Sequence, residues 1–222
     1  MTIADRLDEI RRELPASTRV VAVSKLHPVA MIREAYDAGQ RIFGENRVQE
    51  LVAKQALLPA DIVWHLVGHL QTNKIKPILP FISMIESVDT YRLLYEINRL
   101  AAQCGRVVDV LLQIHIALEE TKFGFSFEEC RQMLRDENIH LLENVRICGL
   151  MGVATNTDDT NRIRSEFAAL RQFFRELQSD FFRGEASFKD LSMGMSNDYP
   201  IAIEEGSTFI RIGSKIFGQR GA

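Results

Sequence analysis

The sequence predicts a closed (β/α)8 barrel, in which eight parallel strands alternate with helices around one core. Eight short runs of apolar or β-branched residues alternate with segments in which apolar residues recur at helical spacing, and eight strands close such a barrel. The alternative, an open doubly wound sheet, normally carries a Gly-x-Gly-x-x-Gly turn after its first strand, whereas residues 25–28 contain no glycine. The expected strands are 20–24, 41–44, 62–67, 84–88, 108–116, 145–151, 188–192 and 209–213.

Helices are expected before the first strand and between the strands. Apolar side chains recur at helical spacing over residues 3–14, and Thr2 with Asp5 forms an N-cap and capping-box pair. Residues 160–177 carry the clearest apolar stripe, which requires a sheet to cover. Weaker stripes of the same kind lie at 91–104 and 127–137. These patterns predict a single-domain barrel over residues 1–222 with an extra N-terminal helix.

Composition and charge narrow the classes of function. A formal net charge of −3 and a pI near 6.0, with basic residues dispersed among acidic ones, argue against a nucleic acid or an anionic membrane as partner. No stretch approaches the ~20 apolar residues that a membrane span needs, and the N-terminus lacks the apolar core of a signal peptide. The three cysteines form no Cys-x-x-Cys pair, so we expect reduced thiols in the cytoplasm.

Lys25 is the first candidate for a reactive group. It directly follows the first expected strand, which residues 26–28 must stop, and barrels keep their chemistry at the carboxyl ends of strands. Side chains alternate along a strand, so Lys25 shares its face with Val21 and Val23. Apolar surroundings destabilise an ammonium group and favour the neutral amine that attacks carbonyls. From position alone, a lysine whose ammonium simply reaches solvent beyond the strand is the plainer interpretation.

Two segments rich in glycine and serine follow the last two expected strands. Residues 193–198 include Ser196, and Gly213 with Ser214 leads into a turn with helical character. Backbone N–H groups at a glycine-to-helix junction bind phosphate, and barrels commonly build such a site after strands seven and eight. A strand-end lysine with two such turns indicates a phosphorylated cofactor that a lysine can hold covalently, and pyridoxal 5'-phosphate meets both requirements.

Arg211 lies between Ile210 and Ile212 in the last expected strand. If the two isoleucines pack outward against helices, the guanidinium points into the barrel and needs a partner, because an unpaired buried charge is costly. A pyridine nitrogen would be one such partner. A buried carboxylate, such as that of Glu86 or Glu45, would be the other.

Further polar residues near the strand ends leave their roles open. Asn46 follows the second strand at a position suited to the barrel mouth. His65, within the third strand, could touch a cofactor ring or could be a core histidine with a satisfied hydrogen bond. Lys122 is a second candidate lysine, ranked below Lys25 because it lies several residues beyond its strand. The histidines show no His-x-His or His-Glu-x-x-His spacing, so no metal site is expected.

Six segments stand out together: VAVSKLHP at 21–28, FGENRVQE at 43–50, WHLVGHLQTNK at 64–74, GLMGVAT at 149–155, LSMGMSND at 191–198 and FIRIGSKIFG at 209–218. In this order they resemble the YggS/PROSC (PLPBP) family of pyridoxal phosphate-binding proteins, also called pyridoxal phosphate homeostasis proteins. The match runs through nearly the whole chain, which makes it more specific than any single motif. His27, His69 and the final Gly221-Ala222 depart from the family pattern, and none of them removes a proposed cofactor contact.

The resemblance implies a single (β/α)8 barrel similar to the N-terminal domain of bacterial alanine racemase, a fold-type III pyridoxal phosphate-binding barrel. It also implies that Lys25 carries the cofactor as a Schiff base, that Arg211 faces the pyridine nitrogen and that Asn46 lines the pocket. By the same resemblance, the phosphate is held by Ser196, Gly213 and Ser214.

The expected function is that of a carrier. An arginine beside the pyridine nitrogen disfavours its protonation and weakens the cofactor as an electron sink. Two-base racemases of this type need a second acid-base group, normally a tyrosine from an additional domain and a partner chain, for which we expect no room in this chain. We therefore expect a protein without catalytic activity of its own that sequesters pyridoxal 5'-phosphate and delivers it to apo-enzymes, and the resemblance implies that it is a monomer. The alternatives are an amino-acid racemase that uses Lys25 as one base, and a cofactor-free barrel enzyme acting on a sugar or indole phosphate.

Overall fold

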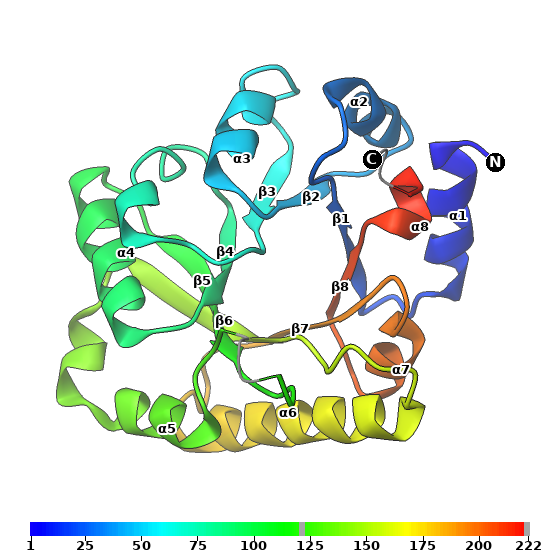
Figure 1. The fold of residues 1–222 in the computed structure, drawn as a ribbon. Helices are drawn as coiled ribbons and strands as arrows, with labels where there is room; N and C mark the ends of the chain where they lie inside the picture. The colour runs from blue at the N-terminus through cyan, green and yellow to red at the C-terminus, as the bar shows by residue number, and fades with distance from the viewer. Residues whose placement is uncertain (120–122, 220–222) are drawn as a thin grey trace.

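The computed structural model describes residues 1–119 and 123–219. In these residues eight parallel strands form a closed barrel in chain order, each pairing with its successor and β8 pairing with β1 (Figure 1). The strands are β1 (Arg19–Val23), β2 (Ile42–Glu45), β3 (Val63–Leu66), β4 (Met84–Val88), β5 (Val108–Ile114), β6 (Val145–Gly152), β7 (Asp190–Met195) and β8 (Phe209–Ile212). The predicted fold class is confirmed.

Helices surround the barrel, and α1 (Ile3–Glu13) precedes the first strand (Figure 1). The expected capping box is present, because the Thr2 N–H donates to Asp5 Oδ2 at 2.8 Å and the Asp5 N–H donates to Thr2 Oγ1 at 3.1 Å. The further α-helices are α2 (Val29–Asp37), α3 (Val48–Gln55), α4 (Tyr91–Gln103), α5 (Phe127–Arg135), α6 (Thr160–Asp180), α7 (Tyr199–Glu204) and α8 (Ser214–Phe217). None of the helices in the described residues combines the length and apolar character needed to cross a membrane.

The connection between β3 and β4 departs from the regular alternation of strand and α-helix. It contains the short 3₁₀-helix η1 (Thr72–Lys74) in place of an α-helix. Pro77 and Pro80 follow closely, and proline cannot continue a helix because it lacks an N–H donor and clashes with the preceding turn. A second 3₁₀-helix, η2 (Glu137–Leu141), follows α5.

The seventh strand begins and ends later in the chain than the sequence predicts. The sequence predicts a strand over 188–192, whereas β7 begins at Asp190 and reaches Met195. Phe188 precedes the strand because its ring stacks on the rings of Phe182 and Phe174, with centroids 4.1 and 4.9 Å away. Packing of aromatic rings under α6, which the local pattern does not encode, therefore decides where the strand starts.

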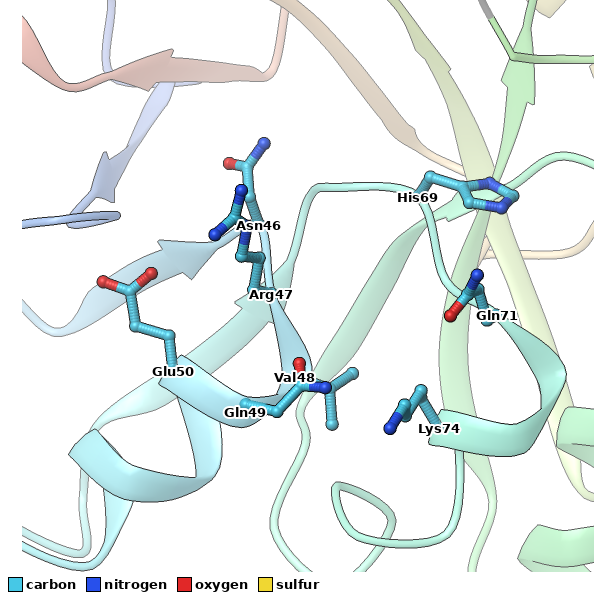
Figure 2. Close-up of a pocket in the computed structure, with 8 residues that line it drawn as sticks. All are labelled: Asn46, Arg47, Val48, Gln49, Glu50, His69, Gln71 and Lys74. Atoms are coloured by element: carbon cyan, nitrogen blue, oxygen red, sulfur yellow. The ribbon is translucent and has the colours of Figure 1, made fainter.

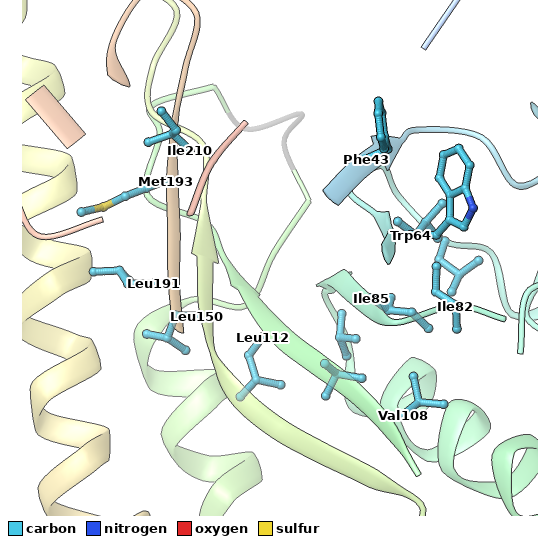
Figure 3. Close-up of a cluster of buried hydrophobic side chains, with 14 of the residues drawn as sticks. Phe43, Trp64, Ile82, Ile85, Val108, Leu112, Leu150, Leu191, Met193 and Ile210 are labelled. Carbon is cyan, nitrogen blue, oxygen red and sulfur yellow. The ribbon is translucent and has the colours of Figure 1, made fainter. Parts of the chain in front are cut away.

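The apolar core has two parts. A small cluster lies inside the barrel and consists of Val21, Met84, Leu111, Cys148, Met151 and Phe209. A larger cluster fills the space between the strands and the helices, and Figure 3 shows Phe43, Trp64, Leu112, Leu150 and Ile210 in it. Strands of a parallel sheet are covered on both faces, which explains why they are apolar at nearly every position. As the alternation predicts, Val21 faces inward while Val20 and Ala22 face the helices.

β6 contains a glycine at its closest approach to β7. Gly149 has a φ of +151°, and a Cβ placed on it would lie 1.7 Å from the backbone oxygen of Asp190. The pairing of β5 with β6 shifts in register at the same point, between Val110 and Leu111. Glycine thus allows β6 to bend here and still pair with both neighbours.

Replacement of Gly149 by alanine is expected to lower the free energy of unfolding by about 3 kcal/mol or more, because the methyl group displaces the β7 backbone and the residue must also keep a positive φ. Gly105→Ala is the matched control. Gly105 has a φ of +62° but open space around its Cβ position, so its loss should be only about 1 kcal/mol. Urea denaturation of both variants measures the difference, and equal losses would contradict the steric argument.

Candidate functional site

The six residues identified from the sequence lie around one pocket at the carboxyl ends of the strands. Its volume is about 550 Å³, which lies within the range of small-molecule sites. The carboxyl ends of all eight parallel strands meet at the same rim of a barrel, so residues that follow different strands become neighbours. The walls include Lys25, Asn46, Ser196, Arg211, Gly213 and Ser214.

The chain turns sharply at Lys25. β1 ends at Val23, and the His27 N–H donates to the Ser24 carbonyl oxygen at 3.1 Å, which closes the turn. Leu26 has a φ of +64°, the one positive value at a non-glycine residue in the described part of the chain. A leucine in this conformation costs about 1–2 kcal/mol, so other groups must hold the turn in place. The turn leaves Lys25 half-buried on the pocket wall.

A buried lysine of α3 holds the backbone on one side of this turn. The Lys54 ammonium donates to the Ser24 carbonyl oxygen at 2.7 Å, to Glu45 Oε1 at 2.7 Å and to Glu50 Oε1 at 2.6 Å. The Lys54 side chain is 7% exposed and Glu45 is fully buried. We call Lys54, Glu45 and Glu50 the Lys54 clamp.

The clamp also reaches the other side of Lys25, because Glu50 Oε1 accepts the Leu26 N–H at 2.6 Å. Burial raises the pKa of Glu45, although hydrogen bonds from Lys54 and Ser24 oppose the shift. A carboxylate buried this fully strongly destabilises the folded protein unless a cation lies beside it. Lys54 therefore supports the buried charge of Glu45, and the clamp holds both backbone segments that flank Lys25, since Lys54 binds Ser24 and Glu50 binds Leu26.

Arg211 extends into the barrel interior and is 5% exposed. Its Nη1 donates to Ser192 Oγ at 2.6 Å, and its Nη2 donates to the Gly152 carbonyl oxygen at 2.8 Å. Ser192 donates in turn to Glu86 Oε2 at 2.6 Å, and that oxygen lies 3.9 Å from Arg211 Nη1. Burial lowers the pKa of Arg211, and the nearby charge of Glu86 opposes this shift. Of the two carboxylates considered as its partner, Glu86 is the one that approaches it, whereas Glu45 belongs to the clamp.

His65 extends this buried network to β3. Its Nδ1 lies 2.6 Å from Glu86 Oε1, and its ring packs edge-on against Phe209 with centroids 5.3 Å apart. Burial acts to raise the pKa of Glu86, but the hydrogen bond and attraction of His65 and the charge of Arg211 outweigh burial and leave that pKa lowered. His65 is absent from the pocket lining and is thus a core histidine with a satisfied hydrogen bond.

The turns after β7 and β8 adjoin each other. The Gly213 N–H donates to Ser196 Oγ at 3.4 Å. A Cβ at position 213 would lie 3.2 Å from the Val23 carbonyl oxygen, so a glycine lets this turn pack closely against β1. Ser214 begins α8 directly afterwards. Hydroxyl and backbone N–H donors from two turns thus gather on the same wall, and this is the kind of donor set that a phosphate accepts.

Two parts of the site were not identified from the sequence. One wall is formed by residues 153–158, which follow β6. These residues directly follow a strand, and the same position after a strand identified Lys25, so the sequence did contain a feature that could have placed them at the site. Lys54 had no such signal, because a lysine in a short amphipathic helix normally extends into solvent.

The remaining candidates lie elsewhere. His69 Nδ1 is 2.6 Å from Asp89 Oδ2, and its ring stacks on Phe123 with centroids 3.9 Å apart. Lys122 lies outside the described residues. Among residues 1–119 and 123–219, no three His, Cys, Asp or Glu side chains are grouped so that they could hold a metal ion.

Comparison with known proteins identifies relatives that cover almost the whole chain. Residues 1–221 match the family described as alanine racemase, N-terminal domain. A pyridoxal phosphate homeostasis protein from Aquifex aeolicus is 38% identical over 203 residues, which span 91% of this chain and 87% of the relative.

Solved structures agree with the fold. PipY from Synechococcus elongatus, solved with PLP bound, has a TM-score of 0.89 and 42% identity over 98% of this chain and 100% of its own. An alanine racemase from Clostridium difficile has a TM-score of 0.74 at 12% identity, covers 100% of this chain with 56% of its own length, and shares the fold. The chain therefore belongs to the alanine racemase N-terminal domain family and, within it, to the pyridoxal phosphate homeostasis proteins.

Proposed function

We propose that this protein binds pyridoxal 5'-phosphate through Lys25 and serves the homeostasis of that cofactor, holding it and passing it to apo-enzymes. The observation that carries the proposal is the convergence of an amine, a buried guanidinium and two glycine- and serine-containing turns on one pocket. The similar protein PipY, with 42% identity, was solved with PLP bound. In this proposal the protein acts in the cytoplasm as a monomer.

The residues of the pocket fit the parts of this cofactor. When bound, the cofactor supplies an aldehyde that condenses with a lysine amine. Lys25 provides that amine at the rim, and Asn46 lines the same wall. Arg211 is assigned to the ring nitrogen, because its guanidinium reaches the pocket from the barrel interior. The phosphate is assigned to Ser196, Gly213 and Ser214.

Two features favour storage of the cofactor over racemisation. The guanidinium of Arg211 is held by Ser192 and Gly152, and a cation beside the ring nitrogen disfavours the protonation that carbanion chemistry needs. The described residues that line the pocket include no tyrosine, the residue that normally supplies the second base in racemases of this type, and the acid-base side chains among them other than Lys25 and Arg211 are the carboxyl groups of Asp158 and Asp198. We therefore propose that the protein has no racemase activity of its own.

Addition of pyridoxal 5'-phosphate to the purified protein is expected to produce a yellow species that borohydride converts into a stable adduct. Peptide mass mapping should locate this adduct on Lys25, the one lysine among the described residues that line the pocket. Lys25→Ala should abolish it. Lys189→Ala is the control, since Lys189 is exposed and precedes β7 at the opposite end of the barrel. Adducts scattered over surface lysines would contradict the assignment.

Mixing the loaded protein with an apo-enzyme that requires the cofactor is expected to restore the activity of that enzyme. The control is Lys25→Ala treated with the same cofactor and freed of unbound molecules, which should restore little. A loaded protein that donates no cofactor would refute the delivery role. A chiral assay across common amino acids should show no stereoinversion, and inversion that disappears in Lys25→Ala would support the racemase instead.

The Lys54 clamp provides the means to position Lys25. It bonds to the backbone of Ser24 and Leu26, the residues on either side of Lys25. The positive φ of Leu26 shows that the turn is held in a conformation that leucine disfavours. We propose that the clamp orients the Lys25 amine before the cofactor arrives, which lowers the cost of ordering the turn on binding.

Lys54→Met is expected to lower the free energy of unfolding by about 3 kcal/mol at pH 7, because Glu45 is then buried without its cation. The deficit should shrink as pH falls. Burial already raises the pKa of Glu45 above the ordinary value of 4.5 although Lys54 opposes the shift, and loss of Lys54 raises it further, so the folded variant takes up a proton that the unfolded chain binds less tightly. Denaturation at several pH values measures both effects.

The double variant Lys54→Met with Glu45→Gln separates positioning from stability. Removal of the stranded charge should restore more than half of the lost free energy of unfolding, whereas formation of the Lys25 adduct should stay slow. Stopped-flow absorbance measures this rate. An adduct that forms at the wild-type rate in the double variant would contradict the positioning role.

A further inference from the structure

A second pocket of about 570 Å³ lies beside the cofactor pocket, between the start of α3 and the connection that contains η1 (Figure 2). Figure 2 shows Gln71 and Lys74 on one side of it, with the Lys74 side chain directed toward the start of α3, where Gln49 lies. Arg47 and Asn46 extend from the end of β2 at the rim. The pocket thus combines two cationic side chains with three amide side chains.

These five side chains are available to a ligand. Among residues 1–119 and 123–219, the side chains of Arg47, Lys74, Asn46, Gln49 and Gln71 make no hydrogen bond or ion pair. Surface cations commonly pair with acids of their own helix or a neighbouring loop. Here two cations from different elements line one pocket without such a partner, with the Arg47 side chain extending toward Asn46 in Figure 2, so the pocket carries an excess of positive charge.

Glu50, the one acidic residue among the described residues that line this pocket, does little to offset the positive charge. The carboxylate of Glu50 already accepts from the Lys54 ammonium at 2.6 Å and from the Leu26 N–H at 2.6 Å. In addition, α3 begins at this wall without a side-chain cap, which leaves the positive end of the helix facing the pocket. Both features add to the attraction that the two cations exert on an anion.

The second pocket is continuous with the surroundings of Lys25. A smaller pocket of about 210 Å³ is lined by Lys25, Leu26, Asn46, Arg47 and Glu50, and so lies between the other two. Asn46 belongs to the walls of all three pockets. An anionic molecule in the second pocket would therefore be adjacent to the reactive amine without occupying its place.

We propose that the second pocket is a non-covalent site for the phosphate group of a small molecule, with Arg47 and Lys74 as its cationic ligands. A phosphate has three terminal oxygens that each accept several hydrogen bonds, so it can use more donors than a single carboxylate can. The guanidinium, ammonium and amide groups of the pocket together supply this larger number of donors. The volume leaves room for a ring attached to the phosphate. The site is distinct from Ser196, Gly213 and Ser214, to which the phosphate of the covalently held cofactor is assigned, and Asn46 borders both pockets.

The test uses protein that has been loaded with pyridoxal 5'-phosphate and reduced with borohydride, so that the covalent pocket is permanently filled. Calorimetric titration with pyridoxine 5'-phosphate, which lacks the aldehyde, should show one binding event per chain that weakens as salt is added. Inorganic phosphate is the second titrant. If pyridoxine 5'-phosphate binds more tightly than inorganic phosphate, the pocket is assigned to phosphorylated small molecules. If the two bind equally tightly, it is assigned to free phosphate. Malonate binding as tightly as either would overturn the phosphate assignment.

Arg47→Ala and Lys74→Ala should each weaken this binding about tenfold, the usual effect of losing one charged hydrogen-bond donor. Lys76→Ala removes the same charge two residues from Lys74 but outside the pocket, and should leave the affinity unchanged. No binding event, or equal weakening in Lys76→Ala, would overturn the proposal. A mass spectrum that shows no adduct after reduction would refute the covalent site alone, and the same variants would still test the second pocket.

Discussion

The hydrogen bonds between β8 and β1 close the barrel, and the candidate site depends on that closure. Their register pairs Val21 with Arg211 and Ala22 with Ile212. The two ends of the chain therefore supply adjacent strands, and Lys25 lines the same pocket as Gly213. In an open sheet the first and last strands would normally stand apart, and the Lys25 amine would lie far from the turns to which the phosphate is assigned.

Charges buried next to this pocket are stabilised in two different ways. Lys54 neutralises Glu45 and also binds backbone, so its charge serves to fix the turn at Lys25. Arg211 is tied through Ser192 to Glu86, which fixes a guanidinium inside the barrel. Buried charges are tolerated where an opposite charge is in place, and such networks hold side chains in single orientations, although Glu45 Oε2 has no hydrogen-bond partner among the described residues. The result is a pocket in which the backbone of Ser24 and Leu26 and the guanidinium of Arg211 are held by protein contacts.

The same barrel serves chemically different proteins, so fold alone does not define activity. The racemase with the similar fold has 12% identity to this chain, whereas the homeostasis protein from Aquifex aeolicus has 38%. In this protein the pocket joins a lysine to an arginine-centred network and adjoins a second cationic hollow at Arg47 and Lys74. The proposed covalent position at Lys25, with the proposed anion site beside it, would suit a protein that receives and releases a phosphorylated molecule.

The sequence by itself determined the strand count, the N-terminal helix and the placement of Lys25, Asn46 and Ser196 after strands. These features follow from apolar spacing, capping residues and the rule that parallel strands end at one rim, all of which are local or general. Only the tertiary structure decided the start of β7, the clamp function of Lys54 and the choice of Glu86 as the carboxylate near Arg211. The physical reason is that local spacing shows which face of an element is apolar, whereas the partner of a buried ring or charge depends on strand order and register between residues far apart in the chain.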